Sequence, residues 1–516
     1  MKDEGPEIRT CDVSLIGAGP GDPGLITVRG LERLREADVV IYDALSDPSL
    51  LQEVSPEAIL IDAGKRAKDH TLTQDEINAL LVEHAEAGRF VVRLKGGDPY
   101  LFGRGGEEAI YLAERGLVCE VLPGVTSGLA APALAGIPAT FRGMSSSVTL
   151  LTGHETPEKS STQLDYAALA GMVRSGGTLC VYMGVGRMAG IMAALVSHGV
   201  SGETPAALVQ WGAMPRQRSV RGTVATLERR VSEAGLGSPA IIVIGSVAGL
   251  DEPALGWFTG RPLFGQRVLV TRTRAQASSL SSALRALGAE VVEAATIRIR
   301  PNEDRAMLDR VVSAVGSYDW LAVTSVNAVE SLRVVMDRVG LDARSLAGVR
   351  VAAVGAATAG SLRERLGVRA DVLPDEAHGG ALATVMLEAS EGSGRALLWR
   401  ADIGGATLPG LLRDSGWTVE DVPAYFTEPV ERLEEGVVEA LAGGGVDWVT
   451  FTSSSTARNL VSCLERAGAG MGSARRVSIG PVTSRTLDEL GYPADVEATE
   501  ASVAGLVRAM VASASG

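Results

Sequence analysis

A glycine-rich segment near the start of the chain has the composition of a ligand-binding loop. It reads IGAGPGDPG at 16–24 and lies between an apolar strand-like run and a helical stretch. Glycines let the backbone approach a ligand, and the helix start that follows offers free N–H groups. A dinucleotide fingerprint needs a third glycine where Asp22 stands, and Pro20 and Pro23 remove amide donors. A nicotinamide cofactor is therefore not predicted, and the loop alone fits a ligand site or a tight turn.

Composition excludes several other kinds of chemistry. The four cysteines lie far apart with no CxxC pair, so we expect neither a disulfide framework nor a zinc or other metal site. A net charge of −14 and the lack of a basic stripe argue against nucleic-acid binding. No apolar run reaches the roughly 18 residues of a membrane span, and the start MKDEGPEIRT lacks a signal-peptide pattern. These features predict a cytoplasmic protein.

The elements that position the loop follow an α/β pattern. Strand-like runs such as CDVSLIG and DVVIYDAL alternate with helical stretches, which predicts largely parallel strands. The segment 251–264 is rich in Gly and Pro without a period, so we expect a linker there between domains at 1–250 and 265–516.

The second half contains an internal repeat. RVLVTRTRAQ parallels RALLWRADIG, DWLAVTSVNAVESL parallels DWVTFTSSSTARNL, and VAAVGAATAG parallels VSIGPVTSRT. The near-constant offset over three strand–helix units predicts two similar α/β lobes with parallel sheets, crossed by IRIRP and AYFTEP. We expect one lobe at about 265–300 plus 428–516 and the other at about 301–427.

The first half resembles uroporphyrinogen-III C-methyltransferases of the tetrapyrrole methylase family. The matching segments include IGAGPGDPGLITVRG, AGKRA, LKGGDPYLFGRGGEE, LPGVTSGLAAPALAGIP and VYMGVG, in order over about residues 11–250. The resemblance implies a two-subdomain methylase fold that transfers two methyl groups from S-adenosylmethionine to uroporphyrinogen III, giving precorrin-2 and S-adenosylhomocysteine.

The resemblance also implies site residues. The family's cofactor contacts fall on Pro20, Gly96, Gly97, Asp98, Leu101, Thr126, Ser127, Met183 and Gly212. A lone Met more often fills a core, and the family usually has Thr after the last glycine, where Ala213 stands.

Asp43 and Lys65 fall on the family's candidate proton acceptor and donor. Asp43 follows an apolar strand, where open α/β sheets place their sites, although helix capping is the alternative. Lys65 can equally be a solvated surface charge.

A substrate with eight carboxylates requires local cations on an acidic protein. Arginine suits bidentate carboxylate pairing, although each candidate can also be a surface ion pair. The candidates are Arg66, Arg93, Lys95, Arg104 and Arg142. The family usually reads Thr-His-Arg where this chain has Thr140-Phe141-Arg142.

Residues from about 265 onward resemble uroporphyrinogen-III synthases through VLVTRTRAQ, LAVTSVNAVE, VPAYFT, VTFTSSSTARN and SIGPVTSRTL. The implied reaction closes hydroxymethylbilane into uroporphyrinogen III with loss of water. Hydroxyls at strand ends and helix-start amides suit carboxylates, although several of these residues can simply cap helices. The predicted substrate contacts are Arg272, Thr324, Ser325, Asn327, Thr452, Ser453, Ser454 and Thr483, and Tyr425 is a candidate proton donor or a cleft-wall aromatic.

Together the two resemblances predict a bifunctional methyltransferase and synthase of siroheme or cobalamin biosynthesis. The family also implies a homodimer through the methylase half. The alternatives are a non-catalytic two-lobed tetrapyrrole-binding module downstream, a methylase for another corrin intermediate, and a nucleotide-binding regulator.

Overall fold

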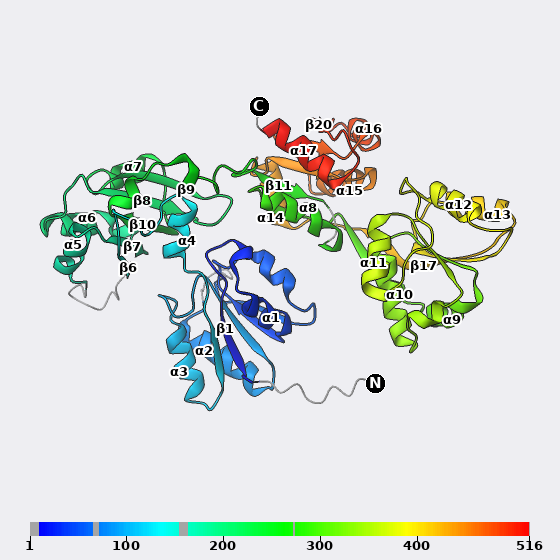
Figure 1. The fold of residues 1–516 in the computed structure, drawn as a ribbon, viewed down its shortest axis with the longest axis horizontal. Helices are drawn as coiled ribbons and strands as arrows, with labels where there is room; N and C mark the ends of the chain where they lie inside the picture. Colours follow the sequence, from blue (N-terminus) through cyan, green and yellow to red (C-terminus); the bar gives the residue numbers. More distant parts are fainter. Residues whose placement is uncertain (1–9, 65–71, 154–163, 272–273, 515–516) are drawn as a thin grey trace. The chain divides into compact units, whose positions relative to one another are not determined.

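The chain divides into two compact units. The structure is a computed structural model that describes residues 10–64, 72–153, 164–271 and 274–514, without the side chains of 274–278. The N-terminal unit comprises Met1–Arg267, Ala283–Glu290 and Ala514–Gly516, and the C-terminal unit comprises Val268–Ser282 and Val291–Ser513 (Figure 1).

The first sheet of the N-terminal unit is entirely parallel, with strand order β3-β2-β4-β1-β5. Its strands are β1 (Val13–Gly17), β2 (Val39–Tyr42), β3 (Ile59–Asp62), β4 (Val91–Lys95) and β5 (Cys119–Leu122). The flanking helices are α1 (Val28–Glu36), α2 (Gln74–Glu86) and α3 (Gly105–Ala113), with short η1 (Pro23–Leu25) and η2 (Pro48–Glu53).

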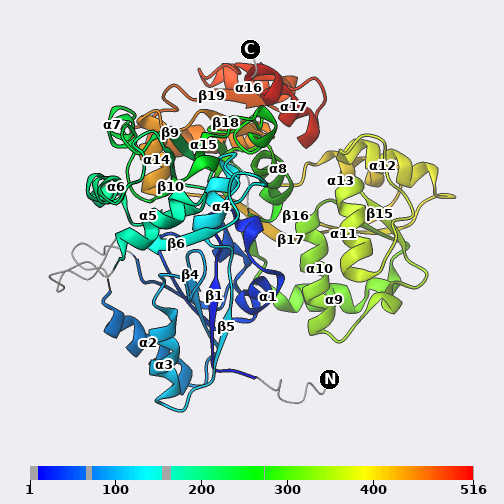
Figure 2. The same ribbon diagram turned by 60° about the vertical axis from the view of Figure 1, so that its left-hand side comes forward.

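Both faces of this sheet are buried, which explains the nearly continuous Val, Ile and Leu in its central strands. Figure 2 shows α1 on one side of the sheet and α2 and α3 on the other. One hydrophobic cluster joins the sheet to α1, and another joins it to α2 and α3. Thr27 and Thr73 cap α1 and α2, the latter with a full capping box to Glu76. Because the strands run in parallel, the loops that leave their carboxyl ends share one edge of the sheet.

The second sheet is mixed rather than parallel, with strand order β6-β7-β10-β8-β9. Only β6 and β7 pair in parallel, because β10 inserts antiparallel between β7 and β8, and a short loop turns β8 back into β9. Its strands are β6 (Val148–Thr152), β7 (Thr178–Tyr182), β8 (Pro205–Gln210), β9 (Arg218–Thr223) and β10 (Ala240–Ile244). The associated helices are α4 (Ser127–Leu134), α5 (Tyr166–Arg174), α6 (Met188–Ser197), α7 (Leu227–Glu233), η3 (Val185–Arg187) and η4 (Ser246–Gly249).

The segment expected to be a linker is packed into the N-terminal unit. It contains η5 (Pro253–Leu255), and Phe258 is 1% exposed, with its ring 5.6 Å from that of Phe264 and 3.9 Å from the Arg261 guanidinium. Gly and Pro spacing showed a break in the strand–helix alternation, but did not show that Phe258 within it is buried.

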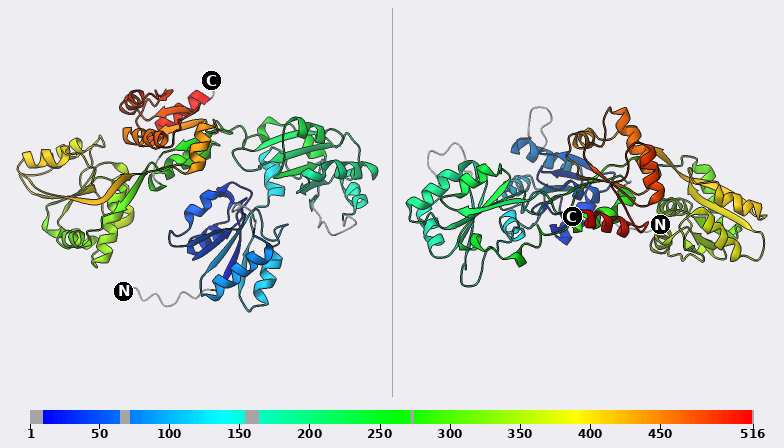
Figure 3. Two further views of the ribbon diagram at one scale, coloured as in Figure 1. Left: turned by 180° about the vertical axis from the view of Figure 1, so that it is seen from behind. Right: turned by 90° about the horizontal axis from the view of Figure 1, so that it is seen from above.

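The C-terminal unit contains two five-stranded sheets, seen from behind in Figure 3. The first has the order β12-β11-β18-β19-β20, from strands β11 (Arg267–Val270), β12 (Glu290–Glu293), β18 (Trp448–Phe451), β19 (Arg475–Ser478) and β20 (Val496–Glu497). The second has the order β13-β17-β16-β14-β15, from strands β13 (Ile297–Pro301), β14 (Trp320–Val323), β15 (Arg350–Ala353), β16 (Arg395–Ala401) and β17 (Thr418–Pro429).

Helices follow the strands of both sheets. They are α8 (Arg274–Ala286), α9 (Arg305–Ser313), α10 (Val326–Arg338), α11 (Ala356–Leu366), α12 (Gly379–Glu388), α13 (Thr407–Asp414), α14 (Glu435–Ala442), α15 (Ser454–Arg466), α16 (Pro481–Glu489) and α17 (Val503–Ala514), with η6 (Val315–Ser317) and η7 (Ala343–Leu346). Among the helices of the described segments, none combines the length and apolar character needed to cross a membrane.

The sequence repeat is visible in the strand order. Strands β12-β11-β18-β19 of one sheet correspond to β17-β16-β14-β15 of the other. The first unit of each repeat copy therefore lies beside the second and third units of the other copy. The two segments expected to cross between lobes, IRIRP and AYFTEP, lie in β13 and β17 and pair antiparallel.

We predict that Phe258→Ala lowers the free energy of unfolding of the N-terminal unit by about 3–5 kcal/mol, because it empties a buried aromatic site. Trp257→Ala is the matched control, since that neighbouring side chain is 62% exposed and its loss should cost about 1 kcal/mol or less. Differential scanning calorimetry of the full chain measures both. Equal, small effects would mean that this segment contributes little to the core.

Candidate functional site

Three glycine-rich loops meet at the carboxyl edge of the first sheet. They leave β1, β4 and β5, which are neighbours in the order β4-β1-β5. Gly97 donates its N–H to the Gly19 carbonyl at 2.7 Å. A Cβ added at Gly124 would lie 2.1 Å from the Gly97 carbonyl and 2.7 Å from the Gly17 Cα. The loops therefore touch backbone to backbone, an approach that a side chain would block.

The carboxylate of Asp98 fastens two of these loops together. Its Oδ2 accepts the Gly124 N–H at 3.1 Å, and its Oδ1 accepts the Tyr100 N–H at 2.9 Å. Asp98 was predicted to contact the cofactor. The structure adds a loop-ordering role, which leaves further lone pairs of the carboxylate able to accept.

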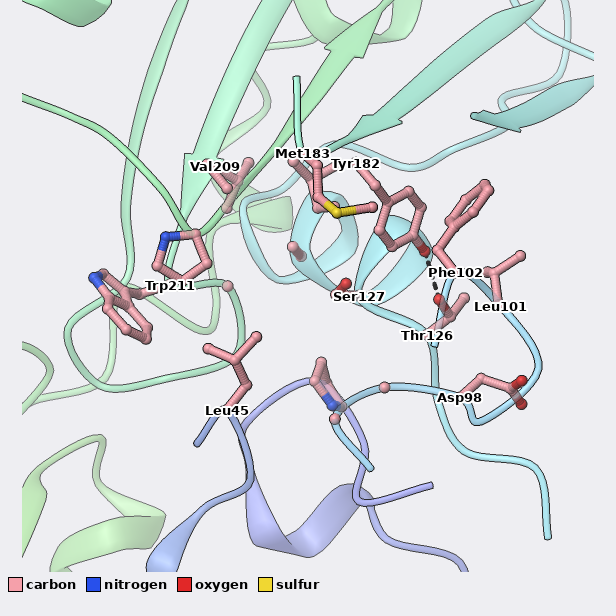
Figure 4. Close-up of a pocket in the computed structure, with 18 of the residues that line it drawn as sticks. Leu45, Asp98, Leu101, Phe102, Thr126, Ser127, Tyr182, Met183, Val209 and Trp211 are labelled. Atoms are coloured by element: carbon pink, nitrogen blue, oxygen red, sulfur yellow. Dashed lines mark hydrogen bonds between the residues drawn. The ribbon is translucent and has the colours of Figure 1, made fainter. Parts of the chain in front are cut away.

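A cavity of about 360 Å³ lies between these loops and the second sheet. Its volume falls in the range of small-molecule sites. All the residues predicted to contact a cofactor line it: Pro20, Gly96, Gly97, Asp98, Leu101, Thr126, Ser127, Met183 and Gly212 (Figure 4). Their segments come from both halves of the N-terminal unit, so the fold brings together residues far apart in the sequence.

The cavity wall also requires Gly212. A Cβ at this position would lie 2.2 Å from the Cβ of Ala131 on α4. The close approach of the β8 end to α4 explains the glycine, although the family's following Thr is replaced by Ala213. A mostly apolar cavity with hydroxyl groups and exposed backbone along its loops fits an adenosyl ligand.

Strained backbone conformations gather at this site. Among the described residues, positive φ angles outside glycine occur only at Phe102, Arg104, Met183, Trp211 and Ala213. Three of these residues line the cavity. Such conformations are costly for residues with a side chain and concentrate at functional sites. Met183 is also 51% exposed, so it does not fill the core as the alternative interpretation supposed.

Sequence reasoning missed several aromatic and apolar residues of the wall. The additional lining residues include Leu45, Phe102, Tyr182, Val209, Trp211 and Met214. Tyr182 and Trp211 directly precede predicted contacts in VYMG and QWGA, and this adjacency was the available signal. Their side-chain directions depend on the backbone conformation at the strand ends, which residue spacing in the sequence does not reveal.

Asp43 lies beside the cavity rather than in its lining. It follows β2, and its Oδ1 accepts a hydrogen bond from Arg93 Nη2 at 2.5 Å. The Asp43 side chain is 33% exposed, whereas that of Arg93 is 3% exposed. A buried, permanently charged guanidinium therefore orients the carboxylate that was predicted to accept a proton.

Arg93 belongs to a buried ion-pair cluster centred on Glu108 of α3. Glu108 Oε1 accepts from Lys95 Nζ at 2.9 Å, Gln74 Nε2 at 3.1 Å and Arg93 Nε at 3.3 Å. The residue is fully buried, and its Oε2 has no partner among the described residues. Burial lowers the pKa of Lys95, and the neighbouring Arg93 charge adds to this effect.

This cluster corrects part of the predicted substrate site. Arg93 and Lys95 were expected to bind substrate carboxylates, but they are 2% and 3% exposed and point into the unit toward Glu108. They lie two residues apart on β4 and therefore share one face of the sheet. Only the packing of α3 on that face showed a compensating carboxylate.

The other predicted cations differ in position. Arg104 and Arg142 are exposed, and Arg104 pairs with Glu107 at 2.6 Å on the surface of α3. Neither residue lines the cavity. Lys65, Arg66 and Arg272 lie outside the described residues.

In the C-terminal unit, two predicted residues meet where Tyr425 of β17 contacts Ser325 at the start of α10. The hydroxyl groups of Tyr425 and Ser325 are 2.9 Å apart, and Ser325 also caps α10 through the Ala328 N–H. Burial raises the pKa of Tyr425, while its hydrogen bond with Ser325 opposes the increase. Thr324 directly follows β14 and is half-buried.

The remaining hydroxyls gather at the ends of β18 and β19. Ser453 caps α15, and Ser454 donates to the Val482 carbonyl at 3.3 Å. Thr452 and Thr483 are both buried in this region. The capping alternative therefore holds for Ser325 and Ser453.

We predict that Glu108→Gln lowers the free energy of unfolding by about 3–5 kcal/mol, because two buried cations lose a compensating charge. Glu107→Gln is the matched control on the same helix. Its exposed pair with Arg104 is screened by solvent, so its loss should cost about 1 kcal/mol or less. Urea unfolding curves give both values, and similar midpoints would contradict the importance assigned to the cluster.

Comparison with known proteins gives two family matches. The family model described as Tetrapyrrole (Corrin/Porphyrin) Methylases matches residues 12–228. The model described as Uroporphyrinogen-III synthase HemD matches residues 278–508. The two matches fall on different halves of the chain and do not overlap.

Individual relatives agree with these matches. Porphyrin biosynthesis protein HemD from Ruminiclostridium josui is 38% identical over 453 residues, which cover 88% of this chain and 89% of the relative. Uroporphyrinogen-III C-methyltransferase from Synechocystis sp. is 49% identical over 235 residues, which cover 46% of this chain and 88% of the relative. The solved uroporphyrin-III C-methyl transferase from Thermus thermophilus complexed with S-adenyl homocysteine is 37% identical, with a TM-score of 0.38 over 46% of this chain and 98% of that one. This chain belongs to the tetrapyrrole methylase family through its first half and to the uroporphyrinogen-III synthase family through its second.

Proposed function

We propose that this chain catalyses two successive steps of tetrapyrrole biosynthesis. The C-terminal part cyclises hydroxymethylbilane to uroporphyrinogen III. The N-terminal part then transfers two methyl groups from S-adenosylmethionine to that product, giving precorrin-2 for siroheme or cobalamin. The gathering of every family cofactor position around one cavity is the observation that carries the proposal.

The cavity supports an adenosyl ligand for geometric reasons. Gly96 and Gly97 leave room for a ligand at the loop backbone, and the hydroxyls of Thr126 and Ser127 supply polar contacts beside an apolar wall. S-adenosylmethionine, when bound, supplies a methyl group on a sulfonium that needs no metal to leave. The protein's own contribution is to hold donor and acceptor in line and to exclude water.

We propose Asp43 as the group that removes a proton from the methylated tetrapyrrole. It stands two residues before Leu45, which lines the cavity, and Arg93 fixes its orientation. Lys65 is proposed as the complementary donor. The exposed cations Arg104 and Arg142, with Arg66, are proposed to bind substrate carboxylates, since arginine pairs with them in bidentate geometry.

In the C-terminal part, Tyr425 is proposed as the proton donor to the departing hydroxyl. Its raised pKa keeps the phenol protonated, and Ser325 fixes the direction of its hydroxyl group. The hydroxyls around Ser453 and Ser454, together with Thr452, Thr483, Asn327, Thr324 and Arg272, are proposed to bind carboxylates of the bilane.

We assign the methylase to residues 1–250 and the synthase to 265–516. We further propose a cytoplasmic homodimer, formed through the methylase half, that uses no metal, nucleic acid or membrane partner. The alternative is a C-terminal part that binds tetrapyrroles without catalysis. The hydrogen bond between Ser325 and Tyr425, which holds the phenol hydroxyl in one direction, supports the catalytic proposal.

We predict that Tyr425→Phe lowers the rate of enzymatic cyclisation about 100-fold, the usual scale for losing a general acid. Tyr318→Phe serves as the control, because that tyrosine is also buried on the same sheet but bonds to Glu420. The rate is the amount of uroporphyrinogen III formed per unit time, measured after its separation from the spontaneously formed isomer. Equal rates for both variants would exclude the proposed proton transfer.

The decisive experiment supplies the purified chain with hydroxymethylbilane, with and without S-adenosylmethionine. We expect uroporphyrinogen III in the absence of the methyl donor and precorrin-2 in its presence. Methylation only of preformed uroporphyrinogen III would favour the non-catalytic module. No methylation of either substrate would contradict the proposed activity of the first half.

A further inference from the structure

The phenol of Tyr182 joins the two sides of the N-terminal cavity. Tyr182 ends β7, and its hydroxyl oxygen accepts the Gly128 N–H at 2.7 Å. The same hydroxyl forms a short hydrogen bond with the hydroxyl of Thr126 (Figure 4). Burial raises the pKa of Tyr182, so the phenol keeps its proton and can donate one hydrogen bond while it accepts another.

This contact replaces an ordinary helix cap. Thr126 stands at the N-cap of α4 but makes no side-chain cap hydrogen bond of its own. The Gly128 amide is one of the first helical N–H groups, which have no partner within the helix. The Tyr182 hydroxyl, at the end of β7, accepts a hydrogen bond from the Gly128 N–H and thereby caps α4.

Gly128 is what makes the contact possible. A Cβ at this position would lie 2.3 Å from the Tyr182 hydroxyl oxygen and 2.6 Å from its ring. Alanine would otherwise be favoured at a helical position by about 1 kcal/mol. Glycine therefore lowers the stability of the helix at this position but allows the close approach of the phenol.

The ring of Tyr182 is held independently of its hydroxyl. Its centroid is 5.0 Å from that of Phe102, which has a positive φ and also lines the cavity. Removal of the hydroxyl alone should leave this ring contact intact. The role of the hydrogen bonds can thus be tested separately from the role of the ring as a core filler.

We propose that the Tyr182 hydroxyl is a positioning group that fixes the start of α4, and with it Thr126 and Ser127, for binding of the adenosyl ligand. The inference rests on the proposed methylase function and adds a residue outside the predicted cofactor contacts. Tyr182 acts through the residues it holds, because its own hydroxyl is engaged by α4. Loss of that hydroxyl should weaken ligand binding more than it slows the chemical step.

The test is calorimetric binding of S-adenosylhomocysteine to the full chain and to variants. Tyr182→Phe is expected to raise Kd about tenfold, as befits the loss of one or two buried hydrogen bonds. Gly128→Ala should weaken binding similarly, although alanine favours the helix. Tyr111→Phe, at a tyrosine of α3 that does not line the cavity, should bind as the unmodified chain does.

Steady-state kinetics separate positioning from a general structural effect. For Tyr182→Phe we expect KM for S-adenosylmethionine to rise about tenfold while kcat at saturation changes by less than about twofold. The double variant Tyr182→Phe/Gly128→Ala should lose little more than either single variant, because both substitutions break the same contact.

The outcomes distinguish the two proposals. If the unmodified chain fails to bind S-adenosylhomocysteine, the proposed function itself is wrong. If the unmodified chain binds and Tyr182→Phe binds equally well, the positioning role is overturned. A fall in kcat without a change in KM would also overturn it, as would fully additive effects in the double variant.

Discussion

Direct backbone contact between glycine-rich loops is the constraint on which the N-terminal site depends. Gly17 ends one of three neighbouring parallel strands, Gly97 and Gly124 follow the other two, and no side chain fits at Gly17 or Gly124. This contact fixes where the loops can lie, and the Asp98 carboxylate then fastens one loop to the next. The cavity follows from that arrangement, because its floor consists of the same backbone segments.

The second sheet completes the cavity through close contacts with α4. Gly212 approaches Ala131, and the Tyr182 hydroxyl reaches the first turn of the helix at Gly128. Positive φ angles at the adjoining strand ends turn side chains such as Met183 toward the cavity. Such strained positions persist only where the surrounding structure determines them. The buried Glu108 cluster stiffens the opposite side by holding Arg93 against Asp43.

The two sheets of the C-terminal unit are each assembled from both copies of the internal repeat. Each of its sheets combines one strand–helix unit of a repeat copy with two units of the other copy, so neither copy can form a sheet alone. Hydroxyl residues at equivalent strand ends, Ser325 and Ser453, both cap the helices that follow. In the second sheet, a buried phenol, that of Tyr425, hydrogen-bonds to the serine at that helix start. The repeat thus places a capping serine after the equivalent strand of both sheets, and the second sheet adds a tyrosine hydroxyl beside it.

The sequence by itself determined the α/β class, the internal repeat, the two family resemblances and those cavity positions that lie in the motifs, because motif residues are local and retain their order. The tertiary structure decided which of these groups face a ligand. Arg93 and Lys95 were predicted to bind substrate, but both are buried beside Glu108 of α3. The segment 251–264 was predicted to be a linker, and it contains Phe258, whose side chain is buried. Burial and ion pairing depend on residues far apart in the chain, so local spacing does not reveal them. For the same reason, only the fold brought Tyr182 to Gly128.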